Sequence, residues 1–228
     1  MKRYAVATLL GLMLVALLLP FDHAISQALS WRSTGGDLRR TLETLQQYGD
    51  VGTLTLVSAI IYLLDPARRR RLLDLYLAAG ATALACLALK ILIGRPRPDL
   101  DKAWSSLEKP WTFLGPTGMF PLRGPDGVIH FTHTWDLGHH GVSDLWSMPS
   151  SHTAAATALS LFLIHIYPRL RPFAIVMVLI VAFGRVATGA HYPSDLLAGA
   201  LVGYLVARPI VRSAWLSQMI SRKIGDRG

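Results

Sequence analysis

The sequence predicts an all-α membrane protein: a polytopic bundle of about six transmembrane helices, with a long outer loop between the third and the fourth. Three observations lead to this class. Of the 228 residues, 52% are hydrophobic and only 16% are charged, which is too apolar for an ordinary soluble domain. The apolar residues fall into six stretches, and arginines gather in short turns between some of them. We expect a single domain over residues 1–228.

The six apolar stretches are residues 4–20, 48–64, 72–93, 149–167, 172–187 and 194–210. Several are shorter than the roughly 20 residues that cross a bilayer, and the second is the least certain. The first resembles either a signal anchor or a cleaved signal peptide, because Lys2 and Arg3 precede it and small residues follow at 24–26. Its length favours the anchor.

The formal net charge of +9 would suit a nucleic-acid-binding protein, but the apolar stretches favour a membrane protein instead. Arginines concentrate in the tight turns at residues 65–71 and 168–172, and again near the C-terminus. Short loops rich in Lys and Arg face the cytoplasm. The charge therefore predicts cytoplasmic termini and a multi-pass protein of the cell (inner) membrane, with no nucleic-acid partner.

The outer segment, residues 94–148, is rich in Gly, Pro, Trp and His. Such a length without regular structure is usually functional, so we expect a lid or binding surface that contains short helices. A metal site is one interpretation of its histidines, together with Asp136 and Asp144, but their spacing matches no strong metal-binding signature. We favour the interpretation without a metal. The four histidines are His130, His133, His139 and His140.

Polar residues converge on the outer ends of the predicted spans. Lys90 and Arg97 follow the third span, and Arg185 ends the fifth. Together they supply one point charge and two planar guanidinium groups, which suit a phosphate-like oxyanion. Lys90 alone is equally explained as a residue that reaches toward the interface. Arg95 has the same local pattern as Arg97, and the residues themselves do not separate the two.

Two further motifs reach the same face. Ser150, Ser151 and His152 open the fourth span, where an N-terminal serine and free amides favour an anion and the histidine can donate a proton. His191 and Asp195 open the sixth span. The carboxylate can fix the imidazole tautomer and leave the other nitrogen as a nucleophile or base. The alternative for Asp195 is a helix-dipole cap.

These motifs together resemble the type 2 phosphatidic-acid phosphatase superfamily, whose phosphate site also occurs in bacterial acid phosphatases and vanadium haloperoxidases. The family pattern is Lys-x6-Arg-Pro, Pro-Ser-Gly-His and Ser-Arg-x5-His-x3-Asp. This sequence has Lys90-x6-Arg97-Pro98, Pro149-Ser-Ser-His152 and Gly184-Arg185-x5-His191-x3-Asp195, within residues 72–210. The family spacing selects Arg97 rather than Arg95. Ser151 replaces the family glycine, and Gly184 replaces the family serine.

The resemblance implies a role for each matched residue. His191 would attack phosphorus to form a phosphohistidine, oriented by Asp195, while His152 protonates the leaving oxygen and then activates water. The remaining matched groups would bind the phosphoryl oxygens, so that no metal or cofactor is required. These phosphate-binding residues are Lys90, Arg97, Ser150, Ser151 and Arg185.

We therefore expect a membrane lipid phosphatase acting at the outer (periplasmic) face. Plausible substrates are phosphatidic acid, phosphatidylglycerol phosphate, a polyprenyl pyrophosphate such as undecaprenyl pyrophosphate, and the phosphate of lipid A. The alternatives are a lipid phosphotransferase with the same site, a vanadium haloperoxidase, and a non-catalytic anion or lipid transporter. The sequence does not determine the lipid or the oligomeric state.

Overall fold

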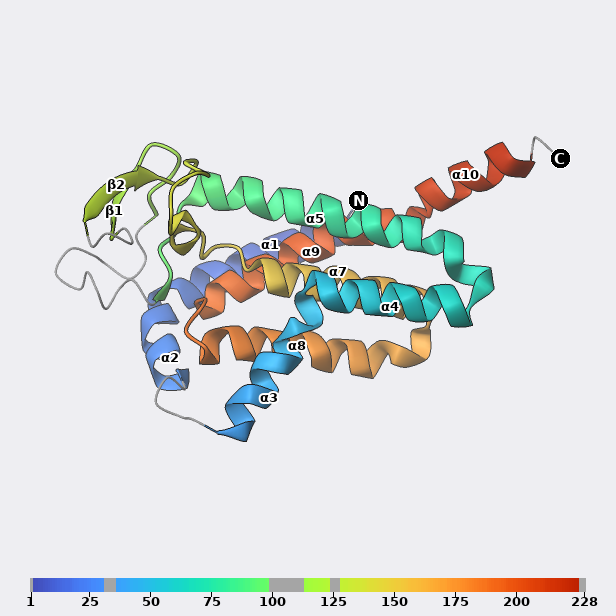
Figure 1. The fold of residues 1–228 in the computed structure, drawn as a ribbon, viewed down its shortest axis with the longest axis horizontal. Coiled ribbons are helices and arrows are strands. Elements are labelled where there is room, and N and C mark those ends of the chain that lie inside the picture. The colour runs from blue at the N-terminus through green and yellow to red at the C-terminus, as the bar shows by residue number, and fades with distance from the viewer. Residues whose placement is uncertain (1, 31–35, 99–112, 124–127, 226–228) are drawn as a thin grey trace.

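The computed structural model describes residues 2–30, 36–98, 113–123 and 128–225, which form an elongated bundle of helices (Figure 1). The first half contains α1 (Lys2–Leu18), α2 (Asp22–Leu29), α3 (Asp37–Leu45), α4 (Val51–Leu64) and α5 (Leu72–Ile93). The second half contains β1 (Met119–Arg123), β2 (Ile129–His133), α7 (Ser151–Ile166), α8 (Arg171–Ala187), α9 (Pro193–Ser213) and α10 (Trp215–Gly225). Short 3-10 turns join several of these helices, at Leu19–Phe21, Gln46–Gly49, Pro66–Arg71, Val142–Leu145 and Pro168–Leu170.

Helix α7 forms the centre of the bundle and packs against α5, α8 and α9. Its small and apolar residues are mostly buried, including Ala154, Ala158 and Phe162. Large apolar side chains of α1, α4, α5 and α8 instead point outward, with Leu9 68% and Leu64 78% exposed. An outward-facing apolar surface of this extent is what contact with lipid requires. The fold confirms the predicted helical membrane bundle.

Four helical segments of the described residues are long and apolar enough to cross a membrane: Tyr4–Leu29, Pro66–Ile93, Pro168–Ala187 and Pro193–Ile220. A fifth span is possible if Arg40–Gly49 and Val51–Leu64 are taken together, although they meet at a 66° bend. Helix α7 has only 16 residues, or about 24 Å, against about 30 Å of hydrocarbon. Six helices match the six apolar stretches, but a count of six membrane spans is not confirmed.

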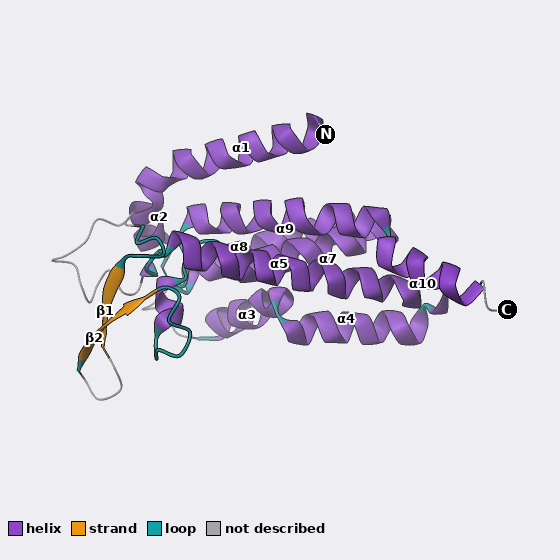
Figure 2. Cartoon of the chain, turned by 90° about the horizontal axis from the view of Figure 1, so that it is seen from above, coloured by secondary structure: helices purple, strands orange, loops and turns teal. Residues whose placement is uncertain are grey.

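The outer segment differs from the expectation of short helices alone. Besides the 3-10 turn at Val142–Leu145, its described part contains an antiparallel hairpin in which Met119 pairs with His133 and Arg123 with Ile129. Residues 99–112 and 124–127 of the predicted loop lie outside the described residues. The hairpin projects from the end of the bundle at which α5 ends and α7 begins (Figures 1 and 2).

The contact between α7 and α9 depends on two glycines. A Cβ atom at Gly199 would lie 2.4 Å from the carbonyl oxygen of Ser150, and one at Gly203 would lie 2.5 Å from that of Ala154. Both distances are far below van der Waals contact. The two helix backbones therefore approach closely only because these positions have no side chain.

We expect Gly203→Ala to lower the free energy of unfolding by about 1–3 kcal/mol, because its methyl group forces α9 away from α7. Gly80→Ala, in α5, is the matched control, since nothing lies within 4 Å of a Cβ atom there. Thermal unfolding in detergent measures the stability of both variants. Equal melting temperatures for the two variants would contradict the close contact.

Candidate active site

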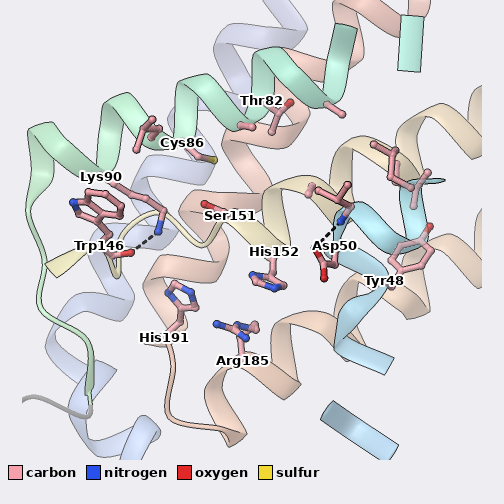
Figure 3. Close-up of a pocket in the computed structure, with 18 of the residues that line it drawn as sticks. Tyr48, Asp50, Thr82, Cys86, Lys90, Trp146, Ser151, His152, Arg185 and His191 are labelled. Atoms are coloured by element: carbon pink, nitrogen blue, oxygen red, sulfur yellow. Dashed lines mark hydrogen bonds between the residues drawn. The ribbon is translucent and has the colours of Figure 1, made fainter. Parts of the chain in front are cut away.

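A cavity of about 450 Å³ lies among α4, α5, α7 and α8 (Figure 3). Charged and histidine side chains line one part of it, and small or apolar side chains line the other. The first group consists of one acidic residue, Asp50, and five basic or histidine residues: Lys90, Arg97, His152, Arg185 and His191. The second includes Leu54, Ala79, Ala83, Cys86, Leu87, Ala155 and Leu159. The cavity thus combines a cationic end with an apolar arm.

The three predicted cations come from different elements. Lys90 is in the last turn of α5, and its ammonium group donates a hydrogen bond to the carbonyl of Trp146. Arg97 follows α5, and its Nε donates to the carbonyl of Ser143 at 3.1 Å. Arg185 ends α8, and its buried Nε has no hydrogen-bond partner among the described residues.

No carboxylate in the described part of the chain forms an ion pair with these three cations. Lys90 is 7% exposed, while Arg97 and Arg185 are half-buried. Cations gathered in a partly buried cavity without ion-pair partners are unfavourable on their own. An anion carrying two negative charges would balance them and would accept hydrogen bonds from their free donors. The cationic end of the cavity is therefore suited to a phosphate group.

His191 lies in the loop between α8 and α9 and is 2% exposed. Its Nδ1 lies 2.7 Å from the carbonyl oxygen of Ser147. A carbonyl oxygen only accepts hydrogen bonds, so Nδ1 carries the proton and Nε2 keeps its lone pair. Burial lowers the pKa of His191 to about 3, so the imidazole is neutral at physiological pH. A neutral imidazole with a free Nε2 can act as a nucleophile.

Asp195 supports His191 less directly than the sequence suggests. Its Oδ2 is 3.7 Å from His191 Nδ1, too far for a hydrogen bond. The same oxygen accepts hydrogen bonds from Ser147 Oγ at 2.5 Å and from the Tyr192 amide at 2.8 Å. Ser147 therefore connects the two residues, because its hydroxyl binds Asp195 while its carbonyl binds His191.

The motif at the start of α7 divides between the cavity and the core. Ser151 and His152 line the cavity. Ser150 is fully buried as the N-cap of α7, where its Oγ accepts hydrogen bonds from the amide and the hydroxyl of Thr153. Ser150 and Asp195 are thus the two predicted site residues that lie behind the cavity, and the Ser150 amide donates to the Asp195 carbonyl at 3.0 Å.

Other lining residues were not predicted from the sequence. At the 66° bend between the turn Gln46–Gly49 and α4, a Cβ atom on Gly49 would lie 2.2 Å from the carbonyl oxygen of His152. The next residue, Asp50, caps α4 and also lines the cavity, as Figure 3 shows. The only sequence signal at this position is a Gly-Asp pair before an apolar stretch, which indicates a helix start rather than a site.

The outer histidines make contacts with one another and with neighbouring groups. His133 stacks on Trp135 with ring centroids 5.1 Å apart, and its Nδ1 lies 3.0 Å from the Gly118 carbonyl oxygen. The rings of His130 and His139 are 6.0 Å apart. Within the described residues, no group of three or more His, Cys, Asp or Glu side chains is arranged to hold a metal ion.

Comparison with known families matches residues 71–219 to the PAP2 superfamily. The chain belongs to the PAP2 superfamily. The matched residues run from the start of α5 into α10 and contain all three motifs that surround the cavity. The predicted resemblance is confirmed, and the apolar exterior makes the chain an integral membrane member of this superfamily.

Two solved structures share the fold. A transmembrane PAP2-type phosphatidylglycerolphosphate phosphatase from Bacillus subtilis is 22% identical, with a TM-score of 0.61 over 93% of this chain and 96% of that chain. LpxE from Aquifex aeolicus is 17% identical, with a TM-score of 0.58 over 84% of this chain and 95% of that chain. Comparison with curated protein sequences gave no match. At these identities the two structures establish the PAP2 membrane fold.

Both departures from the PAP2 pattern have a local structural explanation. Ser151 and Cys86 of α5 both line the cavity, so the Ser151 side chain has a place at the cavity wall. A Cβ atom on Gly184 would lie 3.2 Å from the Cβ atom of Gln46. Glycine at position 184 therefore leaves room for the turn before α4 to pack against α8.

The lowered pKa of His191 predicts how stability depends on pH. Between about pH 6.5 and pH 3, His191 of the unfolded chain binds a proton while the folded protein does not, so stability falls as the pH decreases through this window. We expect the melting temperature of the wild type to fall more from pH 7 to pH 4.5 than that of His191→Asn. The difference should reach at least about 2–4 °C, equivalent to about 1 kcal/mol in a chain of this length.

The control is His140→Asn, at an exposed position of the outer segment, which should keep the pH dependence of the wild type. If the melting temperatures of His191→Asn and the wild type fall by the same amount, burial does not keep His191 neutral.

Proposed function

We propose that this protein is a membrane lipid phosphatase that removes a phosphate or pyrophosphate group from a lipid through a phosphohistidine at His191. The observation that carries the proposal is the two-part cavity, in which unpaired cations adjoin an apolar arm. A phosphate headgroup matches the cationic end, and a hydrocarbon chain matches the arm. The phosphatidylglycerolphosphate phosphatase of similar fold is named for a substrate of this class.

The first step transfers the phosphoryl group to the enzyme. His191 Nε2 attacks phosphorus, forming a P–N bond while the bond from phosphorus to the lipid oxygen breaks. His152 donates a proton to that oxygen, so the lipid leaves as an alcohol or, from a pyrophosphate, as a monophosphate. Lys90, Arg97 and Arg185 stabilise the charge that develops on the phosphoryl oxygens. This arrangement needs no metal ion.

The second step regenerates the enzyme. His152, now neutral, accepts a proton from a water molecule as that water attacks the phosphohistidine. The P–N bond breaks, phosphate is released and His191 is again neutral. The nitrogen that leaves is the one that attacked, so the hydrogen bond from Nδ1 to the Ser147 carbonyl persists through both steps.

The distribution of arginines supports a location of the site at the outer face. Four consecutive arginines occupy the turn Pro66–Arg71, and Arg169 and Arg171 lie at the start of α8. Both turns are at the end of the bundle opposite the hairpin, whereas the residues of the cationic end lie near the end of α5 and the start of α7, on the hairpin side (Figure 1). Because short arginine-rich turns face the cytoplasm, the cavity faces the outer, or periplasmic, leaflet, and the lipid enters from that leaflet.

We expect purified protein to release phosphate from a lipid phosphate in detergent with excess EDTA present. His191→Ala should reduce the rate to background, and His152→Ala should reduce it by about 10²–10⁴-fold, the usual contribution of a general acid. His165→Ala is the matched control, since His165 is an exposed residue on the same helix as His152.

Full activity of His191→Ala would contradict the mechanism. Loss of wild-type activity in EDTA would contradict a reaction without a metal ion. Acid-quenched samples with a radiolabelled headgroup should contain phosphoprotein in the wild type and none in His191→Ala. Label that passes to a second lipid, instead of to water, would identify a phosphotransferase.

If the apolar arm holds the lipid chain, a bulky side chain placed in it should slow hydrolysis of long-chain substrates more than that of substrates without a chain. Ala83→Phe should reduce kcat/KM for a long-chain lipid phosphate by at least about tenfold, while hydrolysis of the chainless substrate p-nitrophenyl phosphate stays within about twofold. Ala88→Phe is the matched control, because Ala88 lies on the same helix, is exposed and does not line the cavity. Equal losses for both substrates in Ala83→Phe would show that the arm does not hold the chain.

A further inference from the structure

Arg95 is a buried cation that the proposed mechanism does not use. Its side chain is 1% exposed, and it does not line the cavity, although Arg97, two residues later, does. Its guanidinium lies over the ring of Tyr192, 4.2 Å from the centroid. A fully buried arginine is costly unless carboxylates and other acceptors surround it.

Two carboxylates pair with this arginine on the side away from the cavity. Arg95 Nη1 lies 2.6 Å from Asp195 Oδ1 and 2.8 Å from Ser194 Oγ, and Arg95 Nη2 lies 2.7 Å from Asp22 Oδ2. Asp22 also accepts hydrogen bonds from the amide and the hydroxyl of Ser194. Both carboxylates are no more than 1% exposed. Arg95 is therefore the counterion that allows these two buried carboxylates to lie close together at the start of α9.

The same arginine reaches the nucleophile by two short routes. Through its side chain it holds Asp195, whose other oxygen binds Ser147 Oγ at 2.5 Å. Through its backbone it holds Ser147 itself, because the Ser147 amide donates to the Arg95 carbonyl at 2.8 Å. Ser147 in turn accepts the hydrogen bond from His191 Nδ1. A displacement of Asp195 would thus move the group that sets the orientation of the imidazole.

Asp22 belongs to α2, which lies outside the residues 71–219 that match the PAP2 family. It comes to the site because the chain bends between α1 and α2, which places α2 against the start of α9. This helix adds no residue to the cavity lining. Its contribution is the second carboxylate on Arg95.

We propose that Arg95, clamped by Asp22, is a positioning residue for the phosphatase reaction, which holds Asp195 and through it Ser147 and His191 in the geometry for attack. This inference rests on the proposed function. It adds to the active site two residues, Arg95 and Asp22, that do not contact the substrate themselves. The guanidinium is needed for its shape as well as its charge, because it bonds two carboxylates and a hydroxyl at once. The single ammonium group of lysine cannot reproduce that arrangement.

The test variant is Arg95→Lys, which keeps the charge between the two carboxylates. We expect kcat to fall about 10²-fold, the effect of a displacement of about 1 Å at a reacting group. KM should stay within about threefold, because the residues that line the cavity are unchanged. Asp22→Asn should lower kcat in the same direction by about tenfold, and the double variant should be no slower than Arg95→Lys alone.

The decisive measurement is a double-mutant cycle with Asp195→Asn. If Arg95 acts through Asp195, Arg95→Lys should cost less than about threefold in kcat when Asp195→Asn is already present. A cost of about 10²-fold in both backgrounds would overturn the proposal, as would full kcat in Arg95→Lys. Should Arg95→Lys not fold, the cycle is run with Asp22→Asn. Its cost of about tenfold should disappear when Asp195→Asn is already present, and a cost of about tenfold in both backgrounds would overturn the proposal.

Arg71→Lys is the matched control for a structural effect. Arg71 pairs with buried Asp74 at 3.1 Å, at the opposite end of α5 from the cavity. We expect this variant to lower the melting temperature and leave kcat unchanged. A fall in kcat for Arg71→Lys that matches its loss of stability would assign the Arg95 effect to stability as well.

The outcomes for the two proposals are distinguishable. Absence of phosphate release and of trapped phosphoprotein in the wild type would overturn the proposed function itself. If the wild type is active but the losses of kcat in Arg95→Lys and Asp195→Asn multiply in the double variant, only the positioning role is overturned.

Discussion

The close approach of α7 and α9 is the constraint on which the rest of the site depends. Gly199 and Gly203 let the backbone of α9 touch that of α7, so that the N-terminal ends of both helices meet at one point. The backbone hydrogen bond between Ser150 and Asp195 joins these ends directly. As a result, His152 at the start of α7 and His191 just before α9 share one cavity.

Charge is divided across that cavity in a way that prepares it for an anion. Lys90, Arg97 and Arg185 face the cavity without carboxylate partners in the described part of the chain. Behind them, Asp22 and Asp195 share Arg95 as their ion-pair partner. Neither carboxylate lines the cavity. A phosphate group is left as the natural counterion of the cavity, and the apolar arm beside it favours a phosphate attached to a hydrocarbon chain.

The sequence was sufficient to predict which residues line the cationic end, because their positions follow from topology. Lys90, Arg97, His152, Arg185 and His191 each lie where an apolar stretch ends or begins, and alternation of spans brings those ends to one face. The number of spans could not be predicted in the same way. The bend before α4 and the short length of α7 arise from packing within the bundle, which hydropathy does not record.

By itself, then, the sequence determined the family, the helical membrane class and the basic and histidine side chains at the cationic end of the cavity, since motif spacing and apolar length are local properties of the chain. Only the tertiary structure decided what lies behind them. Asp22 and Arg95 are far apart in sequence, and Ser147 belongs to none of the three motifs. Their roles depend on the packing of α2 against α9 and on a backbone carbonyl that happens to meet His191. Contacts of this kind exist only after the helices have packed, so no local pattern predicts them.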